Sequence, residues 1–382
     1  ITATMDGGEI SSNIASTTSA TKHPSGGGIC LNGIFALNSG KISNNVKDGQ
    51  WSGGAGVIVS GTFTMNGGEV SRNIDTCTAE EAHTIGGGAF YVMGGTLNIH
   101  GGNITGNASY RGGAIAFHYD AYARGTVNIT GGTITGNYCT SGDGGAIYMP
   151  TAAKGTNIFD QTVNISGNPV ITGNYKGATI TSPEGKYTID SSKAKNENNI
   201  YLSLNQTSSS NTAYAKRQTL ILGELTNGAS IGVTTETPLA AGRKVQITST
   251  ETNTEYYKDA AQYFIPDAAN VVAQVNEGKY VELAYTKDYH KVTLNLSHAS
   301  VSIGSPTTMV KSGESCTIAI KADEGYTLPV GAPSGVTSYK CDNGKITANV
   351  MVKPAEDTNI TIEAVANSYK VEFDGNGSTD GT

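Results

Sequence analysis

Short runs in which apolar and polar residues alternate recur along the first half of the chain. Thr126-Val-Asn-Ile129 and Thr162-Val-Asn-Ile165 each place Val and Ile on one face and Thr and Asn on the other. Because successive side chains of a strand point to opposite faces, this alternation predicts short strands with one buried face. A glycine pair then separates the run from the next apolar residue, and glycine tolerates positive φ. The pattern therefore predicts a tight bend between two short strands.

This unit occurs six times, and its first apolar residue recurs every 28 to 36 residues, at Met5, Leu37, Met65, Ile99, Ile129 and Ile165. A second block of Gly and two apolar residues alternates with it, at Gly28, Gly56, Gly88, Gly113 and Gly145 and, more weakly, at Ala178. One unit cannot bury its apolar face alone, so neighbouring units must stack. We therefore expect an all-β chain built on a right-handed parallel β-helix, with three strands per coil and a period of about 30 residues.

The repeat is regular over residues 1–180 and decays over 181–285, where strand-like runs persist, so we expect the β-helix to cover 1–285. Residues 254–269 hold the one predicted short helix. A helix or loop there would cap the open edge of the last coil, which would otherwise template aggregation.

A second domain, a small β-sandwich of immunoglobulin-like type, is predicted over residues 286–367 from alternating strands at regular spacing. Tyr289-His-Lys-Val292 is echoed by Tyr369-Lys-Val371, so residues 368–382 are expected to begin a further repeat. On this interpretation the chain is a piece of a longer protein.

Composition and net charge argue against several classes of function. Gly accounts for 50 of 382 residues, and only 15% of residues are charged, against roughly 25% in ordinary soluble proteins. A net charge of −7 argues against a nucleic-acid surface, which needs clustered Lys and Arg. The sequence contains no apolar run near the roughly 18 residues needed to span a membrane, so we do not expect a membrane-spanning segment.

Six asparagines fall at one position of the coil. Asn side chains in stacked coils can bond one another and the turn backbone, which predicts a structural ladder and no ligand array. The ladder consists of Asn13, Asn45, Asn73, Asn107, Asn137 and Asn174.

The paired glycines and the Ile/Val-x-x-Asn signature are similar to the repeats of polymorphic outer-membrane-type and related bacterial surface β-helices. Those families have Phe-x-x-Asn where this chain has Ile or Val, so the match is to the repeat pattern and covers about residues 1–180. Val371-Glu-Phe-Asp-Gly-Asn-Gly also resembles the opening of internalin-type B-repeats. The resemblance implies a secreted or cell-surface bacterial protein, usually adhesive and built with a stalk of small β domains.

One loop gathers the candidate ligand-binding side chains, because Tyr rings and hydrogen-bonding groups together suit a sugar face. A solvated loop insertion is the alternative. The candidates are His118, Tyr119, Asp120, Tyr122 and Arg124 in the loop, with Tyr148 lining a neighbouring groove.

Catalysis has weak support in the sequence. A hydrolase needs two carboxylates facing one bond and a calcium-assisted lyase needs several acidic oxygens and a base, yet Asp120 and Asp143 are isolated. We expect no catalytic residue, no metal and no cofactor, and hence a non-catalytic adhesin-like or stalk protein presenting a face for host or environmental glycans or surface proteins. The alternative is a polysaccharide lyase or glycoside hydrolase of β-helix type.

The cysteines do not form a disulfide framework. Cys30 aligns with Ile58 and Phe90, which predicts a buried apolar position. Cys77 and Cys139 are expected two coils apart, too far for a bridge, whereas Cys316 and Cys341 share one domain and form a possible disulfide.

Overall fold

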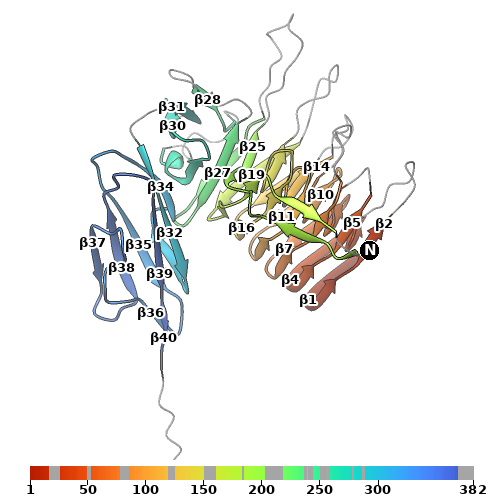
Figure 1. Cartoon of the computed structure of the whole chain (residues 1–382), viewed down its shortest axis with the longest axis horizontal. Coiled ribbons are helices and arrows are strands. Elements are labelled where there is room, and N and C mark those ends of the chain that lie inside the picture. Colours follow the sequence, from red (N-terminus) through yellow and green to blue (C-terminus); the bar gives the residue numbers. More distant parts are fainter. Residues whose placement is uncertain are drawn as a thin grey trace, which may run out of the picture.

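The computed structural model shows a stack of short parallel strands that leads into a second, smaller β unit (Figure 1). Strands account for 56% of the chain and helices for 2%, which confirms the all-β prediction. The structure describes residues 1–16, 26–49, 53–77, 86–118, 125–149, 161–182, 185–202, 218–235, 239, 244–249, 256, 258–277, 279–285 and 289–368.

Each coil contains four strands, and each strand pairs in parallel with its counterpart in the next coil. A complete coil runs through β10 (Phe90–Val92), β11 (Thr96–Ile99), β12 (Asn103–Thr105) and β13 (Ala108–Ser109). The next coil repeats this order in β14 (Ile115–Phe117), β15 (Thr126–Ile129), β16 (Thr133–Thr135) and β17 (Tyr138–Cys139). This is the arrangement expected of a parallel β-helix, and we call it the coil stack.

The other strands extend the same four rows. The first row holds β3 (Ile29–Leu31), β6 (Val57–Val59), β18 (Ile147–Met149) and β25 (Ile200–Leu202). The long strands β1 (Thr2–Ser11) and β4 (Ile34–Ser43) span the second and third rows, which continue in β7 (Thr62–Met65), β19 (Thr162–Gly167) and β26 (Ile221–Leu225), and in β8 (Glu69–Ser71), β20 (Val170–Ile171) and β27 (Ser230–Thr235). The fourth row, a sheet of its own, holds β2 (Ile14–Ser16), β5 (Val46–Asp48), β9 (Ile74–Asp75) and β21 (Tyr175–Lys176).

The fourth row corrects the prediction of three strands per coil. Its strands follow the repeated Asn and are only two or three residues long. A run of two residues cannot display the alternation on which the sequence prediction relied.

Inside the stack the apolar residues form columns, with Leu97, Val127 and Val163 in direct register and fully buried. The first row corrects the placement of Cys30. Ile29 and Val57 are register partners, so Cys30 occupies the outward position beside them and is exposed. The sequence comparison aligned Phe90 with Ile58, but in the structure Phe90 pairs with Val57, so that alignment was shifted by one residue.

A small antiparallel sheet closes the C-terminal end of the stack. It consists of β28 (Lys244–Gln246), β31 (Tyr280–Tyr285) and β30 (Val271–Asn276), beside the last parallel strand, β29 (Phe264–Pro266). The predicted short helix is present as the four-residue 3-10 helix η4 (Ala260–Tyr263).

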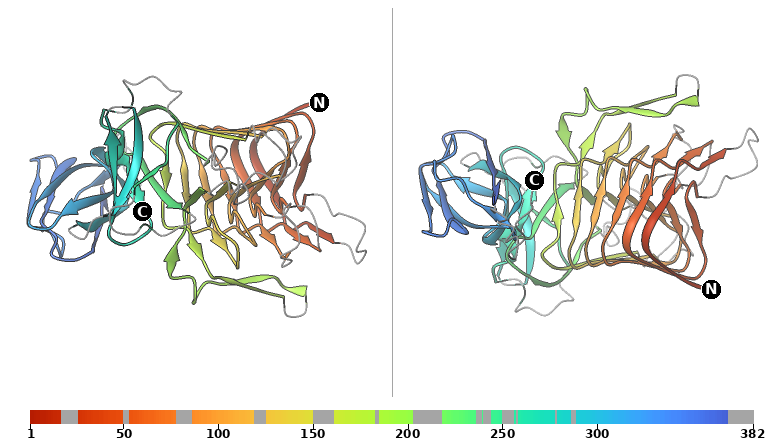
Figure 2. Two further views of the ribbon diagram at one scale, coloured as in Figure 1. Left: turned by 90° about the horizontal axis from the view of Figure 1, so that it is seen from above. Right: turned by 90° about the horizontal axis from the view of Figure 1, so that it is seen from below.

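A hairpin arm runs back along the side of the stack (Figure 2). It is formed by β22 (Thr179–Thr181) and β23 (Thr188–Asp190), and the chain then returns through β24 (Asn196–Glu197), which pairs antiparallel with β21. The hydroxyl of Tyr187 donates to Asp48 Oδ2 at 2.8 Å, so the arm reaches from the sixth coil to the second.

The second unit has two main sheets around a separate apolar core that includes Val292, Ile320 and Val350. One sheet has the order β34 (Thr307–Lys311), β32 (Tyr289–Ser297), β39 (Thr358–Glu363), and the other β33 (Ala299–Ile303), β35 (Cys316–Ala322), β38 (Thr347–Val352), β37 (Ser338–Cys341). A short pair, β36 (Tyr326–Thr327) and β40 (Val365–Ala366), completes it. The β32–β39 pairing is parallel, and the other pairings in the unit are antiparallel.

The possible Cys316–Cys341 disulfide is wrong. Cys316 pairs with Val352 and Cys341 pairs with Ala348, on opposite sides of β38. Two strand spacings and four residues separate the thiols, which is beyond the reach of a bridge. Both cysteines are free, as are Cys77 and Cys139. The residues predicted to begin a further repeat lie, from 369 on, outside the described part of the chain.

Candidate functional site

The repeated asparagines form one continuous row inside the stack, at the corner between the third and fourth strand rows. In each step the Nδ2 of one Asn donates to the Oδ1 of the Asn in the next coil, at 2.9 Å from Asn13 through Asn137. The backbone N–H of each donor residue points at the same oxygen, at 3.0 to 3.2 Å. A second amide proton reaches a backbone carbonyl, such as Ile104 O from Asn137. The ladder supplies hydrogen-bond partners for backbone N–H and C=O groups of the turns, which would otherwise be buried without a partner.

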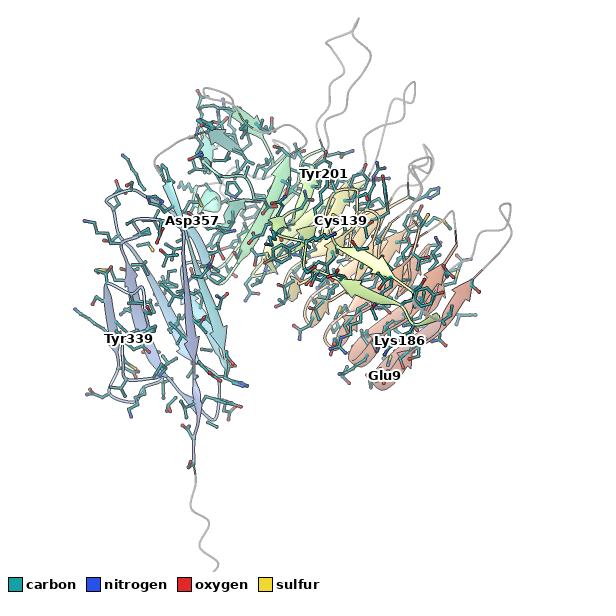
Figure 3. All side chains as sticks on the ribbon, viewed as in Figure 1. Glu9, Cys139, Lys186, Tyr201, Tyr339 and Asp357 are labelled. Carbon is teal, nitrogen blue, oxygen red and sulfur yellow. The ribbon has the colours of Figure 1, made fainter. Side chains whose placement is uncertain are left out.

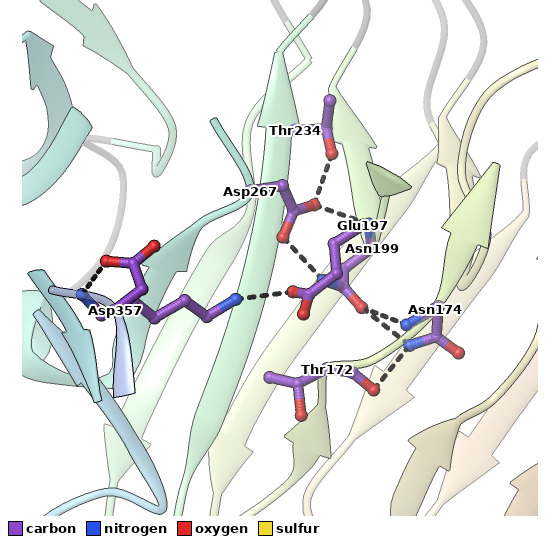
Figure 4. Close-up of polar contacts among 8 residues, drawn as sticks. Thr172, Asn174, Glu197, Asn199, Thr234, Asp267 and Asp357 are labelled. Atoms are coloured by element: carbon purple, nitrogen blue, oxygen red, sulfur yellow. Dashed lines mark hydrogen bonds and ion pairs between the residues drawn. The ribbon is translucent and has the colours of Figure 1, made fainter. Parts of the chain in front are cut away.

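The ladder continues past the six predicted residues to Asn199 and ends on a carboxylate (Figure 4). Asn174 donates to Asn199 Oδ1 at 2.8 Å, and Asn199 donates its Nδ2 and backbone N to the two oxygens of Asp267, each at 2.6 Å. The Thr234 hydroxyl also donates to Asp267 Oδ2. Each Asn side chain donates a hydrogen bond to the next residue of the ladder, always in the same direction along the stack. The last residue therefore only needs to accept hydrogen bonds, and an ionised carboxylate can only accept them.

Burial sets the protonation of this last residue. Desolvation raises the pKa of Asp267 to about 6, and the nearby Glu197 adds to the rise, whereas the hydrogen bonds from Thr234 and Asn199 lower it. Glu197 is itself paired with Lys291 of the second unit at 2.8 Å, and the two ionic side chains are about three-quarters buried. The closing carboxyl of the ladder therefore lies next to the junction of the two units.

The raised pKa of Asp267 predicts a pH dependence of stability. A carboxyl that binds its proton more tightly in the folded chain than in the unfolded chain favours folding at low pH. Because the pKa is raised to about 6, a contribution of about 3 kcal/mol is lost as the pH rises from about 4 to about 6. The free energy of unfolding should be measured against pH for the wild type and Asp267→Asn. The difference between the curves should show this fall, and parallel curves would contradict it.

The outer face of the first row carries two of the predicted ligand-binding residues. His118 lies after β14, and its Nδ1 is 2.5 Å from the hydroxyl of Tyr91, a fully buried side chain on β10. Gln161 donates its Nε2 to the backbone O of His118. The Oε1 of Gln161 is buried and has no hydrogen-bond partner among the described residues. A polar cluster is thus built at the base of the predicted loop.

Tyr148, the second of these residues, belongs to a stack of rings and a cation. Its ring is parallel to that of Tyr201 on β25 (labelled in Figure 3), with centroids 5.9 Å apart. The two residues are register partners between buried neighbours, which places both on the outer face of the first row. The guanidinium carbon of Arg111 is 5.1 Å from the Tyr148 ring and 5.3 Å from the Tyr110 ring. Cation–ring contacts of this kind hold a flat aromatic surface in one orientation.

The remaining loop candidates, Tyr119, Asp120, Tyr122 and Arg124, lie outside the described residues, so their arrangement around His118 stays a prediction. Arg111 and Tyr201 are members of the site that the sequence prediction missed. The register would have found Tyr201, because Asn199-Ile-Tyr-Leu repeats the spacing of Ala146-Ile-Tyr-Met at the same coil position.

Two carboxylates share one cavity, of about 170 Å³, at the end of the stack. Glu197 and Asp267 line it with Thr234, Leu239 and Leu283. A glycosidase needs one carboxyl that is protonated and one that is ionised, and the raised pKa of Asp267 beside an ion-paired Glu197 resembles that state. Both oxygens of Asp267, however, already accept hydrogen bonds from Asn199. The main role of this carboxyl is therefore to accept the last hydrogen bonds of the asparagine ladder.

Within the described ranges, no group of three or more His, Cys, Asp or Glu side chains is placed to hold a metal ion. A search of the same residues for a helix long and apolar enough to cross a membrane found none. Comparison with protein-family models, with curated proteins and with solved structures found no match.

Proposed function

We propose that the chain is a non-catalytic scaffold of a secreted or cell-surface bacterial protein, in which a right-handed β-helix presents a binding face for glycans or surface proteins. The second unit, as an immunoglobulin-like or B-repeat-like domain, would belong to a stalk. The observation that carries the proposal is the half-buried ring of Tyr148 on the outer face of the first row, which lies between the buried ring of Tyr201 and the guanidinium of Arg111 from the turn before β14. Sugar rings pack on such faces through their C–H groups and bond neighbouring polar side chains.

The position of this stack supports a binding role over a purely structural one. Long connections follow the first row after His118, Met149 and Leu202, and they also follow the fourth row after Ser16 and Asp75, whereas the bends between the second and third rows stay short. Variable loops on a rigid repeat are where recognition residues gather. We expect the ligand to contact Tyr148 and the loop that contains Tyr119, Asp120, Tyr122 and Arg124.

Binding to glycan and matrix-protein arrays tests the proposal. Arg111→Ala and Tyr148→Ala should each weaken binding of the ligand found about tenfold or more, since a partly desolvated cation–ring contact contributes about 1 to 2 kcal/mol. The matched control is Tyr138→Ala, which removes a stacked Tyr of similar geometry, 6.2 Å from Tyr175, on the fourth row. Equal losses in all three variants would indicate a folding defect, and binding to no ligand would leave only a spacer role.

The second candidate function is a carbohydrate-active enzyme, favoured by the cavity that contains Glu197 and Asp267. The same glycans are therefore to be scored for cleavage. Turnover that disappears in Glu197→Gln would replace the binding proposal with the catalytic one.

A further inference from the structure

A fully buried ion pair lies between the second and third coils, away from the binding face. Lys47 on β5 and Asp75 on β9 are direct partners in the parallel register of the fourth row. Nζ of Lys47 is 3.1 Å from Oδ1 of Asp75, and both side chains have no solvent exposure. A pair so buried has lost the hydration of both charges, and the attraction between them recovers that loss only where every remaining polar atom is satisfied.

That condition is not met, because the two oxygens of Asp75 have different surroundings. Oδ1 accepts from Lys47 Nζ and from the backbone N–H of Cys77, at 3.2 Å. Oδ2 is buried with no hydrogen-bond partner among the described residues. The Lys47 ammonium also donates to the backbone O of Gly49 at 2.7 Å. The amine is thus held beside a carboxyl carbon that has one bonded oxygen and one unbonded oxygen.

We propose that Lys47 and Asp75 condense to an amide, an isopeptide bond that links the second coil covalently to the third. Proton transfer along the 3.1 Å contact first converts the ammonium and carboxylate to a neutral amine and a neutral acid. The Nζ lone pair then attacks Cγ, and the proton that Oδ1 received passes to Oδ2, so that negative charge develops on Oδ1, where the N–H of Cys77 stabilises it. Oδ2 takes a second proton from Nζ and leaves as water, so that one C–N bond forms, one C–O bond breaks and nothing is oxidised or reduced.

Burial favours the first step. Desolvation raises the pKa of Asp75 above its ordinary value, although the charge of Lys47 and the N–H of Cys77 act against the rise. A dry site therefore favours the protonated carboxyl of Asp75, and it also keeps water from hydrolysing the product. Fixed contact between the reacting groups corresponds to an effective concentration on the order of 10⁵ M or more, which removes most of the entropic barrier to condensation.

The product fits the surrounding polar groups better than the ion pair does. Oδ1 becomes the amide oxygen and keeps the bond from Cys77 N, and the remaining amide N–H keeps Gly49 O as its acceptor. The unbonded oxygen is the atom that leaves. The two buried charges of the pair and its unbonded carboxyl oxygen are then both removed.

Mass spectrometry of the intact, denatured protein tests the proposal. We expect a mass lower than that of the sequence by one water. Trypsin should not cut after Lys47, so that a peptide spanning 42–72 should be found joined to the peptide spanning 73–111, with fragment ions placing the link between Lys47 and Asp75. A wild-type mass equal to that of the sequence after prolonged incubation in the folded state, with a free peptide ending at Lys47, would overturn the proposal.

Lys47→Arg is the matched control, because it keeps the positive charge beside Asp75, but the guanidinium stays protonated and is a poor nucleophile. The mass of this variant should equal the mass calculated from its sequence, because no water is lost. A loss of water that persists in this variant would show that the reaction occurs elsewhere in the chain and would also overturn the assignment. The wild-type peptide map decides the question even if the variant does not fold.

Discussion

Asn137→Ala should lower the free energy of unfolding of the coil stack by about 4 kcal/mol, among the largest losses expected for one side chain. The side chain is fully buried, and its Oδ1 accepts both the Nδ2 and the backbone N of Asn107. Its Nδ2 serves Asn174 and the carbonyl of Ile104. The smaller residue leaves these groups buried without their hydrogen-bond partners, and urea denaturation measures the loss.

The same coil offers a matched control. Asn128 also belongs to an amide row, bonding Asn98 at 2.8 Å and Asn164 at 2.7 Å, but this row lies on the outer face of the second strand row, where water can replace the amide. Asn128→Ala should therefore cost about 0.5 to 1 kcal/mol. Similar losses in the two variants would refute the view that the inner ladder carries the stability of the turns.

Asp267→Ala should cost about 3 kcal/mol or more, because it leaves the backbone N and the Nδ2 of Asn199 with no acceptor at the buried end of the ladder. Asp267→Asn should be close to neutral at pH 7. A single amide oxygen accepts the same two donors at every earlier step of the ladder, as Asn137 does for Asn107. Thermal or urea unfolding of the two variants gives the comparison.

The outcome separates two roles for the Asp267 carboxyl. A carboxylate that only ends the ladder is replaceable by an amide, whereas one whose charge is required at the junction with the second unit is not. Equal destabilisation by Asn and Ala would therefore contradict the assignment of Asp267 as an acceptor for Asn199 and would direct attention to its charge beside Glu197.

The ladder shows how far the sequence predicts the site. The six repeated asparagines were recognisable because each follows the same apolar signature at a period that stacking requires. Asn199 follows no such signature, and Asp267 differs in residue type, so only the direction of the hydrogen bonds reveals them. The fourth strand row was not predicted for a related reason, since its strands are too short to show an alternation of apolar and polar residues.

The contact between Lys47 and Asp75 could have been predicted from the sequence, because each residue follows a ladder asparagine, Asn45 or Asn73, by two positions. The contact between Tyr187 and Asp48 was not, because nothing local relates residues 139 positions apart. The ring stack at Tyr148 lies between these cases: its strand was predicted, but Arg111 comes from a turn whose path depends on tertiary packing.

A stack of coils opens from its ends, because each coil contacts only its neighbours. The hairpin arm changes this, since it leaves the sixth coil and is fastened through Tyr187 to Asp48 in the second. Asp48 also accepts a bond from Thr76 of the third coil at 2.7 Å. Fraying of the second coil therefore requires the arm to detach from it. The backbone amides of coils two to six should exchange with solvent deuterium as a single cooperative unit, with the first coil, beyond the reach of the arm, exchanging on its own.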